Sequence, residues 1–264
     1  MLFIKNLPFV NVTGNGVASV SLPVGMSYNR ILLKLGGGLN KANITRIRVK
    51  LNGKAIDDMS GARLEAVNAY RNRAQNASFM ILDFVEPDAK TMAEQLVGNI
   101  NTASGVSSFT IEVTISGADG GVTLDSFSEL APPAPLGAIT KKIEFTAGMT
   151  GAGKWPFKLI DIANRGAIVK RVHFFHGGNV SALEVKMNGV VIHDNIDTAV
   201  NGFNQADYHK AAQENVYTYD PCMDDNYANA LRTDKMTSLE FNLTTAGADN
   251  VVAVLEVIDL LPNM

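Results

Sequence analysis

A five-residue segment occurs twice in this chain. Residues 49–53 are Val-Lys-Leu-Asn-Gly, and residues 185–189, 136 positions later, are Val-Lys-Met-Asn-Gly. In both segments apolar and polar residues alternate and end in Asn-Gly, which is typical of a type I′ hairpin turn because both residues tolerate positive φ. One such hairpin is common, but two within matched strands indicate that the chain contains one β unit twice.

The similarity extends beyond these two segments. At the same spacing, the apolar residues Ile44, Ile47, Val49, Leu51 and Ile56 match Val180, Leu183, Val185, Met187 and Ile192. Further along, the spacing becomes 130, so that Phe109, Ile111 and Val113 match Leu239, Phe241 and Leu243. At this spacing the closing strands match as well, with Glu129-Leu130 opposite Asp259-Leu260. The common order of these patterns predicts a duplicated fold.

A proline-rich segment lies at the midpoint of the chain. Residues 131–137 contain Pro132, Pro133 and Pro135. Proline lacks the N–H that a sheet ladder needs and favours an extended, stiff connector. We therefore expect a first domain at 1–131, a linker at 132–137 and a second domain at 138–264.

Short strands separated by Gly, Asn and Ser account for most of each half. The expected strands include residues 18–22, 30–35, 79–85, 142–146, 168–175 and 216–219. Helical composition appears at 60–75 and 196–213, with shorter helical segments at 89–96 and 226–231. About eight strands per half, without regular helices between them, predict an all-β protein of two tandem eight-stranded jelly rolls with short helices in the connecting loops.

Composition excludes several classes of protein. The 264 residues carry a formal net charge of −3, which disfavours a general nucleic-acid-binding surface. The one cysteine, Cys222, cannot form an internal disulfide, and we expect it to be buried or half-buried. The apolar start of the chain is interrupted by Lys5 and Pro8, and no apolar run approaches about 20 residues. We expect a soluble product that is made and assembled in the cytosol.

One segment has the spacing of a phosphate-binding loop. Residues 148–154 match the glycine and lysine positions, and residues 79–83 resemble a Walker B strand. However, Trp155 stands where Ser or Thr would bind Mg²⁺, and Pro156 follows it. A glycine-rich connecting loop is the favoured interpretation.

The histidines show no metal-binding pattern. His173 and His176 are three apart around a predicted strand, which places them on opposite faces, while His193 and His209 stand separately. No His-x-His motif occurs, and all four histidines lie in the second half. Isolated structural or surface histidines are expected, so a cupin-like enzyme is disfavoured.

Charged residues gather at three places. Asp57-Asp58 and Asp224-Asp225 could contribute oxygen ligands to a structural Ca²⁺, although solvated turn carboxylates are the favoured interpretation. The residues Arg46, Arg48, Lys50 and Lys54 form a basic stripe on one hairpin, for which a solvated face is expected and an acidic or phosphate partner is the alternative. No catalytic, cofactor-binding or metal-binding residue is therefore predicted.

Several segments together resemble one family. They are residues 3–7, 21–28, 44–53 and 215–220, with the closing strand pair. The chain is similar in these segments to double jelly-roll major capsid proteins of icosahedral dsDNA viruses that contain an internal membrane, above all to the corticovirus-type bacteriophage coat protein. No catalytic residue is carried across, because a coat protein has none to match.

The resemblance implies a structural role. It implies a homotrimer whose six jelly rolls form a pseudo-hexameric capsomer, and capsomers that tile an icosahedral shell. Implied partners are neighbouring capsomers, minor capsid and membrane proteins of the virion, and the internal membrane surface, with no specific nucleic acid and no small-molecule substrate. The protein would reside in the virion after synthesis and assembly in the host cytoplasm.

Two other functions remain open from the sequence. A tandem β-sandwich that binds carbohydrate or a receptor would need an aromatic platform, and the chain has one Trp. A two-domain cupin-like enzyme would need metal ligands. We expect no enzymatic activity.

Overall fold

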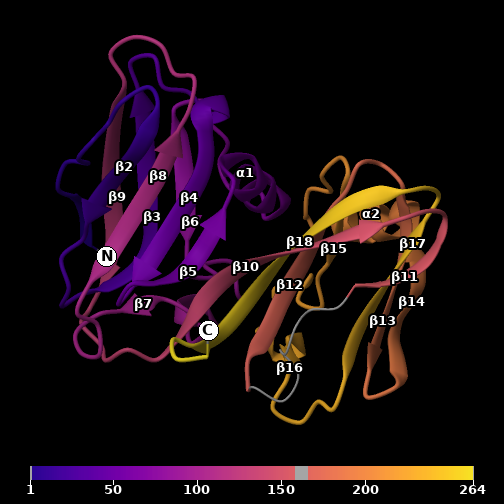
Figure 1. Ribbon diagram of the computed structural model, residues 1–264. Helices are drawn as coiled ribbons and strands as arrows, with labels where there is room; N and C mark the ends of the chain where they lie inside the picture. Colours follow the sequence, from indigo (N-terminus) through magenta and orange to yellow (C-terminus); the bar gives the residue numbers. More distant parts are fainter. Residues whose placement is uncertain (1, 158–165, 264) are drawn as a thin grey trace. The chain divides into compact units, whose positions relative to one another are not determined.

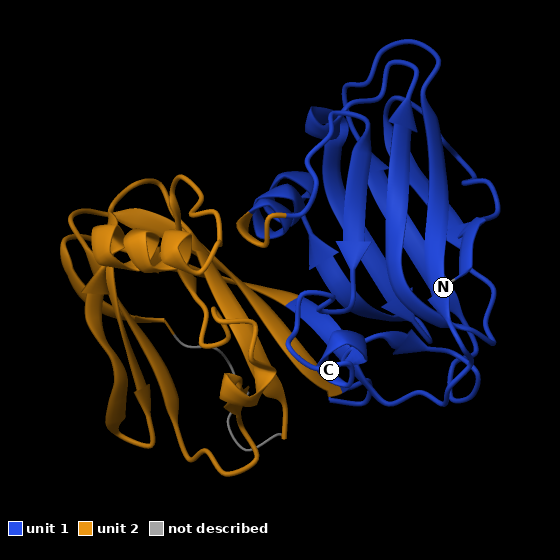
Figure 2. Ribbon diagram, turned by 180° about the vertical axis from the view of Figure 1, so that it is seen from behind, with its two compact units in different colours: residues 1–69, 73–142, 260–264 blue, residues 70–72, 143–259 orange. Residues whose placement is uncertain are grey.

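The computed structural model describes residues 2–157 and 166–263. The chain forms two compact units (Figure 2). Unit 1 comprises residues 1–69, 73–142 and 260–264, and unit 2 comprises residues 70–72 and 143–259. Two strands, β10 and β18, contribute residues to both units, and each unit is described below by itself.

Unit 1 consists of short strands with one α-helix (Figure 1). Its elements are β1 (Leu2–Lys5), β2 (Gly16–Ser21), β3 (Ser27–Gly36), a 3₁₀ turn (Lys41–Asn43), β4 (Ile44–Leu51), β5 (Lys54–Met59), α1 (Gly61–Tyr70), β6 (Phe79–Asp83), a 3₁₀ turn (Glu94–Leu96), β7 (Ile100–Asn101), β8 (Phe109–Ile115), β9 (Thr123–Ala131) and the start of β10 (Ala138–Met149). One sheet has the order β1-β9-β3-β6, with β7 also paired to β3, and the other contains β2-β8-β4-β5.

Unit 2 contains the remaining elements. They are the rest of β10, β11 (Gly153–Phe157), β12 (Ile168–Phe175), β13 (Val180–Met187), β14 (Val190–Asp197), α2 (Thr198–Asp207), β15 (Val216–Tyr219), a 3₁₀ turn (Tyr227–Asn229), β16 (Leu231–Arg232), β17 (Leu239–Thr245) and β18 (Asp249–Leu260). Its sheets have the orders β10-β18-β12-β15, with β16 also paired to β12, and β11-β17-β13-β14.

The two units have the same topology. Adding nine to each strand number of unit 1 gives the corresponding strand of unit 2 in both sheets. The helices also correspond, because α1 connects β5 to β6 and α2 connects β14 to β15. Each unit is a jelly roll of two four-stranded sheets, so the predicted all-β class and the two tandem eight-stranded jelly rolls are confirmed.

The hairpin that reveals the repeat folds identically in both copies. Asn52 and Asn188 have φ values of 50° and 52°, and the glycine after each has a φ of 78°, as a type I′ turn requires. The side-chain oxygen of Asn52 accepts hydrogen bonds from residues 107–108 at 2.7, 3.1 and 3.3 Å. Asn188 accepts the equivalent three from residues 237–238 at the same distances. Each asparagine thus shapes its own turn and attaches it to the loop before the neighbouring strand.

A β-bulge recurs in the opposite sheet and corrects the alignment of the closing strands. The register of β3 with β9 shifts before Arg30, which pairs with Glu129, and that of β12 with β18 shifts before Arg171, which pairs with Glu256. Glu129 therefore corresponds to Glu256 at a spacing of 127, and the predicted match to Asp259 is wrong. The reason is that β18 continues beyond the paired segment, so the end of the strand does not mark the register.

Each helix is attached to its unit by a buried amide. The Nδ2 of Asn68 on α1 donates to the carbonyl of Ile81 at 2.8 Å. The Nε2 of Gln205 on α2 donates to the carbonyl of Thr218 at 3.1 Å. Both partners lie on the matching strand of their unit, and burial without competing water favours one docking position.

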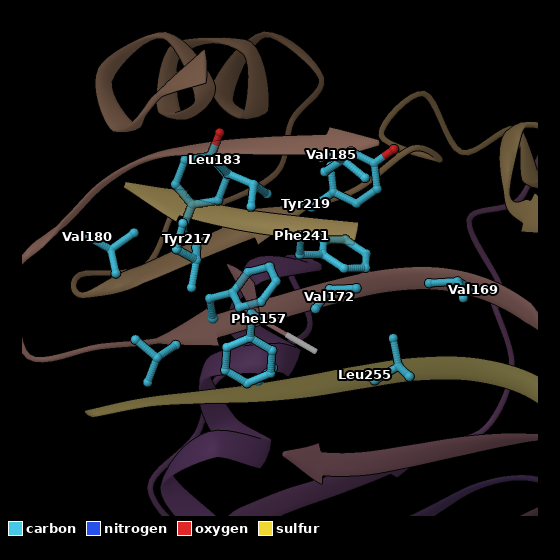
Figure 3. Packing of buried hydrophobic residues seen from close by; sticks show 14 of the residues in the cluster. Phe157, Val169, Val172, Val180, Leu183, Val185, Tyr217, Tyr219, Phe241 and Leu255 are labelled. Carbon is cyan, nitrogen blue, oxygen red and sulfur yellow. The ribbon is translucent and has the colours of Figure 1, made fainter. Parts of the chain in front are cut away.

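The core of unit 2 is filled from both of its sheets (Figure 3). Phe174 on β12 contacts Phe157 and Phe241 with ring centroids 5.4 and 5.7 Å apart, and Tyr219 lies 5.9 Å from Phe241. These rings are nearly or fully buried. They bring the two sheets together through offset or edge contacts, the geometries that aromatic pairs prefer.

The helices are shorter than the sequence predicts. Residues 71–75 and 208–213 lie outside α1 and α2. Asn72 and His209 adopt left-handed φ values of 53° and 56° just beyond the helices, a conformation that ends helices. The proline-rich residues 132–137 form no strand, as predicted, apart from one isolated bridge between Pro135 and Ser104.

Candidate functional site: an apolar edge surface

The segment with phosphate-loop spacing connects two strands. Residues 150–152 form the turn between β10 and β11, and a strand follows it where a phosphate-binding loop needs a helix. Lys154 lies 2.7 Å from a carboxylate oxygen of Glu184, and this hydrogen bond lowers the pKa of Glu184. Trp155 donates to the carbonyl of Gly151 at 2.9 Å and packs against the core of unit 2. The segment is a structural turn, and its tryptophan lies partly within the protein.

The Walker-B-like residues form β6. Asp83 at its end is buried, and its carboxylate lies 2.9 Å from the guanidinium of Arg73. Arg73 also contacts Asp88 at 2.8 Å. This aspartate therefore stabilises a charged cluster within unit 1.

The four histidines occupy separate environments. His173 is buried in β12, with Nδ1 2.9 Å from Thr218 Oγ1. His176 lies just beyond that strand, and His193 on β14 has Nε2 2.9 Å from the hydroxyl of Tyr217. Burial lowers the pKa of both His176 and His193. Within residues 2–157 and 166–263, no group of three His, Cys, Asp or Glu side chains is arranged to hold a metal ion.

The first acidic pair differs from the prediction. Asp57 and Asp58 lie within β5, whereas solvated turn positions were expected, and Asp57 is 2% exposed. Its carboxylate lies 2.9 Å from Nζ of Lys142, which is buried as well. The prediction was wrong because the partner lies 85 residues further along the chain. The second pair, Asp224-Asp225, does lie in a turn, where Asp225 contacts Lys210 at 2.6 Å.

The basic stripe meets acidic partners within unit 1. Arg46 and Arg48 both bind Asp58, at 2.5 and 3.1 Å, and Lys50 binds Glu112 at 2.6 Å. Burial would raise the pKa of Asp58, but the two arginines lower it, and the hydrogen bond from Lys50 lowers the pKa of Glu112. Three of the four cations of the stripe are thus held in ion pairs, which leaves little cationic charge for a nucleic-acid backbone.

The one cysteine of the chain, Cys222, is fully buried, as predicted. Among the helices in the described part of the chain, none has both the length and the apolar character needed to cross a membrane.

An exposed apolar surface in unit 2 was not predicted from the sequence. It lies on β14 and α2 of unit 2 and is named here the β14–α2 surface. Its members are Val190, Val191, Ile192, Val200 and Phe203, exposed by 63, 41, 38, 54 and 78%. The signal was present, because three consecutive apolar residues on a strand cannot all face the core.

A groove extends along the β14–α2 surface. Its volume is about 540 Å³, and its apolar lining includes Ile196, Pro221 and Met223 besides members of the surface. Strand β14 is the last strand of its sheet and pairs on one side with β13. An open strand edge beside exposed apolar side chains is typical of a surface that binds another protein.

A second open strand lies at the start of the chain. Strand β1 is the last strand of its sheet and pairs on one side with β9. Leu2 and Phe3 on it are 50% and 49% exposed. Phe3 stacks on Phe127 with ring centroids 6.0 Å apart, so the strand is held against unit 1 while part of its apolar surface stays exposed.

The family follows from comparison with known proteins. The model of the viral coat protein P2 N-terminal domain matches residues 3–131, and that of the C-terminal domain matches residues 139–261. The chain belongs to the viral coat protein P2 family. It is therefore a structural protein of a viral shell, as the sequence analysis predicts. No curated protein sequence matches this member of the P2 family.

Solved structures show the same fold at low sequence identity. The major capsid protein P2 from bacteriophage PM2 has a TM-score of 0.89 at 20% identity, covering 98% of this chain and 97% of that one. A chain of Sulfolobus Turreted Icosahedral Virus has a TM-score of 0.70 at 14% identity, covering 98% and 91%. A capsid chain of the PBCV-1 virus has a TM-score of 0.61 at 11% identity, covering 98% and 94%. The P2 family member described here thus has a double jelly-roll fold over nearly its whole length.

Proposed function

We propose that this chain is a major capsid protein whose homotrimers form pseudo-hexameric capsomers of an icosahedral shell. The observation that carries the proposal is the identical strand order of the two jelly rolls in a chain of the viral coat protein P2 family. Three chains with two similar units each provide six similar building blocks. A threefold assembly can then have a nearly sixfold outline, which packs efficiently in a shell.

Several finer features belong to the same proposal. The domains extend over residues 1–131 and 138–264, with residues 132–137 as the linker. The protein has no catalytic role, and it acts through its shape and its interfaces. Its partners are neighbouring capsomers, minor capsid and membrane proteins and the internal membrane surface of the virion, after synthesis and assembly in the host cytoplasm.

The experiment that tests the proposal is a mass measurement in solution. One chain has a mass of 28.3 kDa, so a trimer measured by light scattering after size exclusion has about 85 kDa. Electron micrographs of the same fraction should show particles with a six-sided outline. A particle that remains a monomer over the whole accessible concentration range would contradict the proposal.

A further inference from the structure

The β14–α2 surface differs from its counterpart in unit 1. Ile192 on β14 is 38% exposed, whereas the equivalent Ile56 on β5 is 1% exposed. On the helices, Phe203 is 78% exposed, and the equivalent position in α1 is occupied by the smaller Ala66, which is half-buried. Two jelly rolls of one topology therefore bury the same edge to different extents.

In unit 1 the corresponding edge pairs at one position with the strand that opens the next repeat. Lys142 on β10 pairs in parallel with Asp57 on β5, and their side chains form a buried ion pair. Strand β10 is the first strand of the second repeat, just as β1 is the first strand of the first. In unit 1 the fifth strand of one repeat thus pairs with the first strand of the repeat that follows, at Asp57 and Lys142.

Among the described residues, no strand takes the corresponding place beside β14 in unit 2. We infer that the β14–α2 surface binds a second copy of the chain, which contributes its strand β1 along the open edge of β14. This inference rests on the proposed homotrimer and specifies the surface that holds it together. Since β10 lies parallel to β5, β1 of the second copy lies parallel to β14.

Strand β1 fits this role. Among the described residues it pairs on one edge only, and its exposed Leu2 and Phe3 match the apolar character of Val191 and Ile192. A strand that adds to an open sheet edge gains main-chain hydrogen bonds, while its side chains enter apolar pockets such as the groove beside Phe203. The apolar side chains of both partners would leave water together.

The contact is head to tail, because unit 2 of one copy meets unit 1 of the next. Such heterologous contacts generate closed rings when the rotation between copies closes. Three copies then present three β14–β1 contacts.

Charged substitutions on the surface test the inference. In the full chain, Phe203→Asp and Ile192→Lys should each raise the concentration at which trimers dissociate by at least about 100-fold, since a charge buried in an apolar contact is strongly unfavourable. The reciprocal substitution Phe3→Asp should have the same effect. The matched control is Met92→Lys on unit 1, whose side chain is 84% exposed and lies outside both surfaces, and it should leave the trimer unchanged. All four side chains are at least partly exposed, and unchanged circular dichroism and thermal melting verify that each variant folds.

Cross-linking tests the two partners directly. A chain carrying both Phe3→Cys and Ile192→Cys, treated with a short bismaleimide, should give linked dimers and trimers on a denaturing gel, while each single variant stays monomeric. The native Cys222 is fully buried and serves as the unreactive background.

The outcomes separate the two proposals. If the wild type is a trimer, all three charged variants are also trimers and the double-cysteine chain does not cross-link, then the assignment of the surface is overturned and the homotrimer is preserved. A wild-type chain that never exceeds a monomer overturns both. Trimers lost in Phe203→Asp, Ile192→Lys and Phe3→Asp but kept in Met92→Lys support the assignment.

Discussion

The recurring arginine–glutamate pair allows one test with an internal control. Arg30 and Glu129 in unit 1 lie 2.6 Å apart with side chains 39% and 14% exposed, whereas Arg171 and Glu256 in unit 2 lie 2.5 Å apart with both side chains 1% exposed. In both pairs the contact joins Nε of the arginine to Oε2 of the glutamate. The pairs therefore differ mainly in access to water.

Removing one partner should have very different consequences at the two places. Arg30→Met leaves Glu129 accessible to water, so we expect a loss of unfolding free energy of about 0–1 kcal/mol. Arg171→Met leaves Glu256 buried without its main cation, which should cost about 3–5 kcal/mol. Arg171 also donates to the hydroxyl of Tyr227 at 2.9 Å, and this contact is lost as well.

The pH dependence of the unfolding free energy gives an independent test of the buried pair. Burial would raise the pKa of Glu256, but Arg171 and other nearby cations, Lys170 first among them, hold this pKa far below its usual value. A depressed carboxyl pKa stabilises the folded state above the unfolded-state pKa, and this contribution is lost as the pH falls towards the folded-state pKa. The wild type should therefore lose stability below about pH 4, and Arg171→Met should show a much smaller loss there.

The measurement is urea unfolding followed by circular dichroism at pH 7 and at several values between about pH 4 and pH 2. The double variant Arg171→Met with Glu256→Leu should recover most of the lost stability at pH 7, because an apolar pair can replace a buried ion pair. Equal losses for Arg30→Met and Arg171→Met would show that burial does not set the strength of this pair, and would refute the reasoning.

Three further predictions follow from other contacts. Asn52→Ala and Asn188→Ala should each lower the unfolding free energy by about 1–3 kcal/mol in urea titrations, because each loses three turn hydrogen bonds, and a difference of more than twofold between them would contradict their equivalence. Gly189→Val should lower it by about 1–3 kcal/mol, since valine strains at a φ of 78°, and an unchanged melting temperature would refute the turn assignment. Burial raises the pKa of Asp220 to about 6, although Tyr70 donates to its carboxylate at 2.9 Å. A raised carboxyl pKa favours the folded state at low pH, so this group should reduce stability by about 3 kcal/mol as the pH rises from about 4 to above 6, and Asp220→Asn should remove that dependence from thermal melts.

The features that sequence predicts well are local. Alternation of apolar residues identifies β4 and β13, and Asn-Gly identifies the turn after each, because both depend on neighbours within a few positions. The registers of β4 with β8 and of β13 with β17 also agree with the spacings of 136 and 130: Val49 faces Ile111, and Val185 faces Phe241. The jelly-roll class follows from such patterns together with the turn spacing.

The features that sequence did not reveal depend on distant partners. The buried state of Asp57 depends on Lys142, and the spacing of the closing strands depends on which residues of β18 pair with β12, because β18 extends beyond that paired segment. The run Val190–Ile192 does signal exposed side chains, but it does not show that β14 is the last strand of its sheet. An edge is defined by the neighbour it lacks, and the local pattern of a strand does not contain that information.

The two repeats differ in most residues yet agree in a few polar contacts, and this contrast explains how one topology persists. Apolar core residues can exchange with one another as long as volume and pattern are kept. The turn asparagines, the bulge with its Arg–Glu pair, and the helix amides Asn68 and Gln205 each require one partner in one register. Because these contacts set the same strand registers and helix positions in both units, a difference in burial between equivalent positions does not come from the fold itself. It reflects a different neighbour, and for this reason the proposed contact with a second copy depends on the exposure of Phe203, which the half-buried Ala66 does not share.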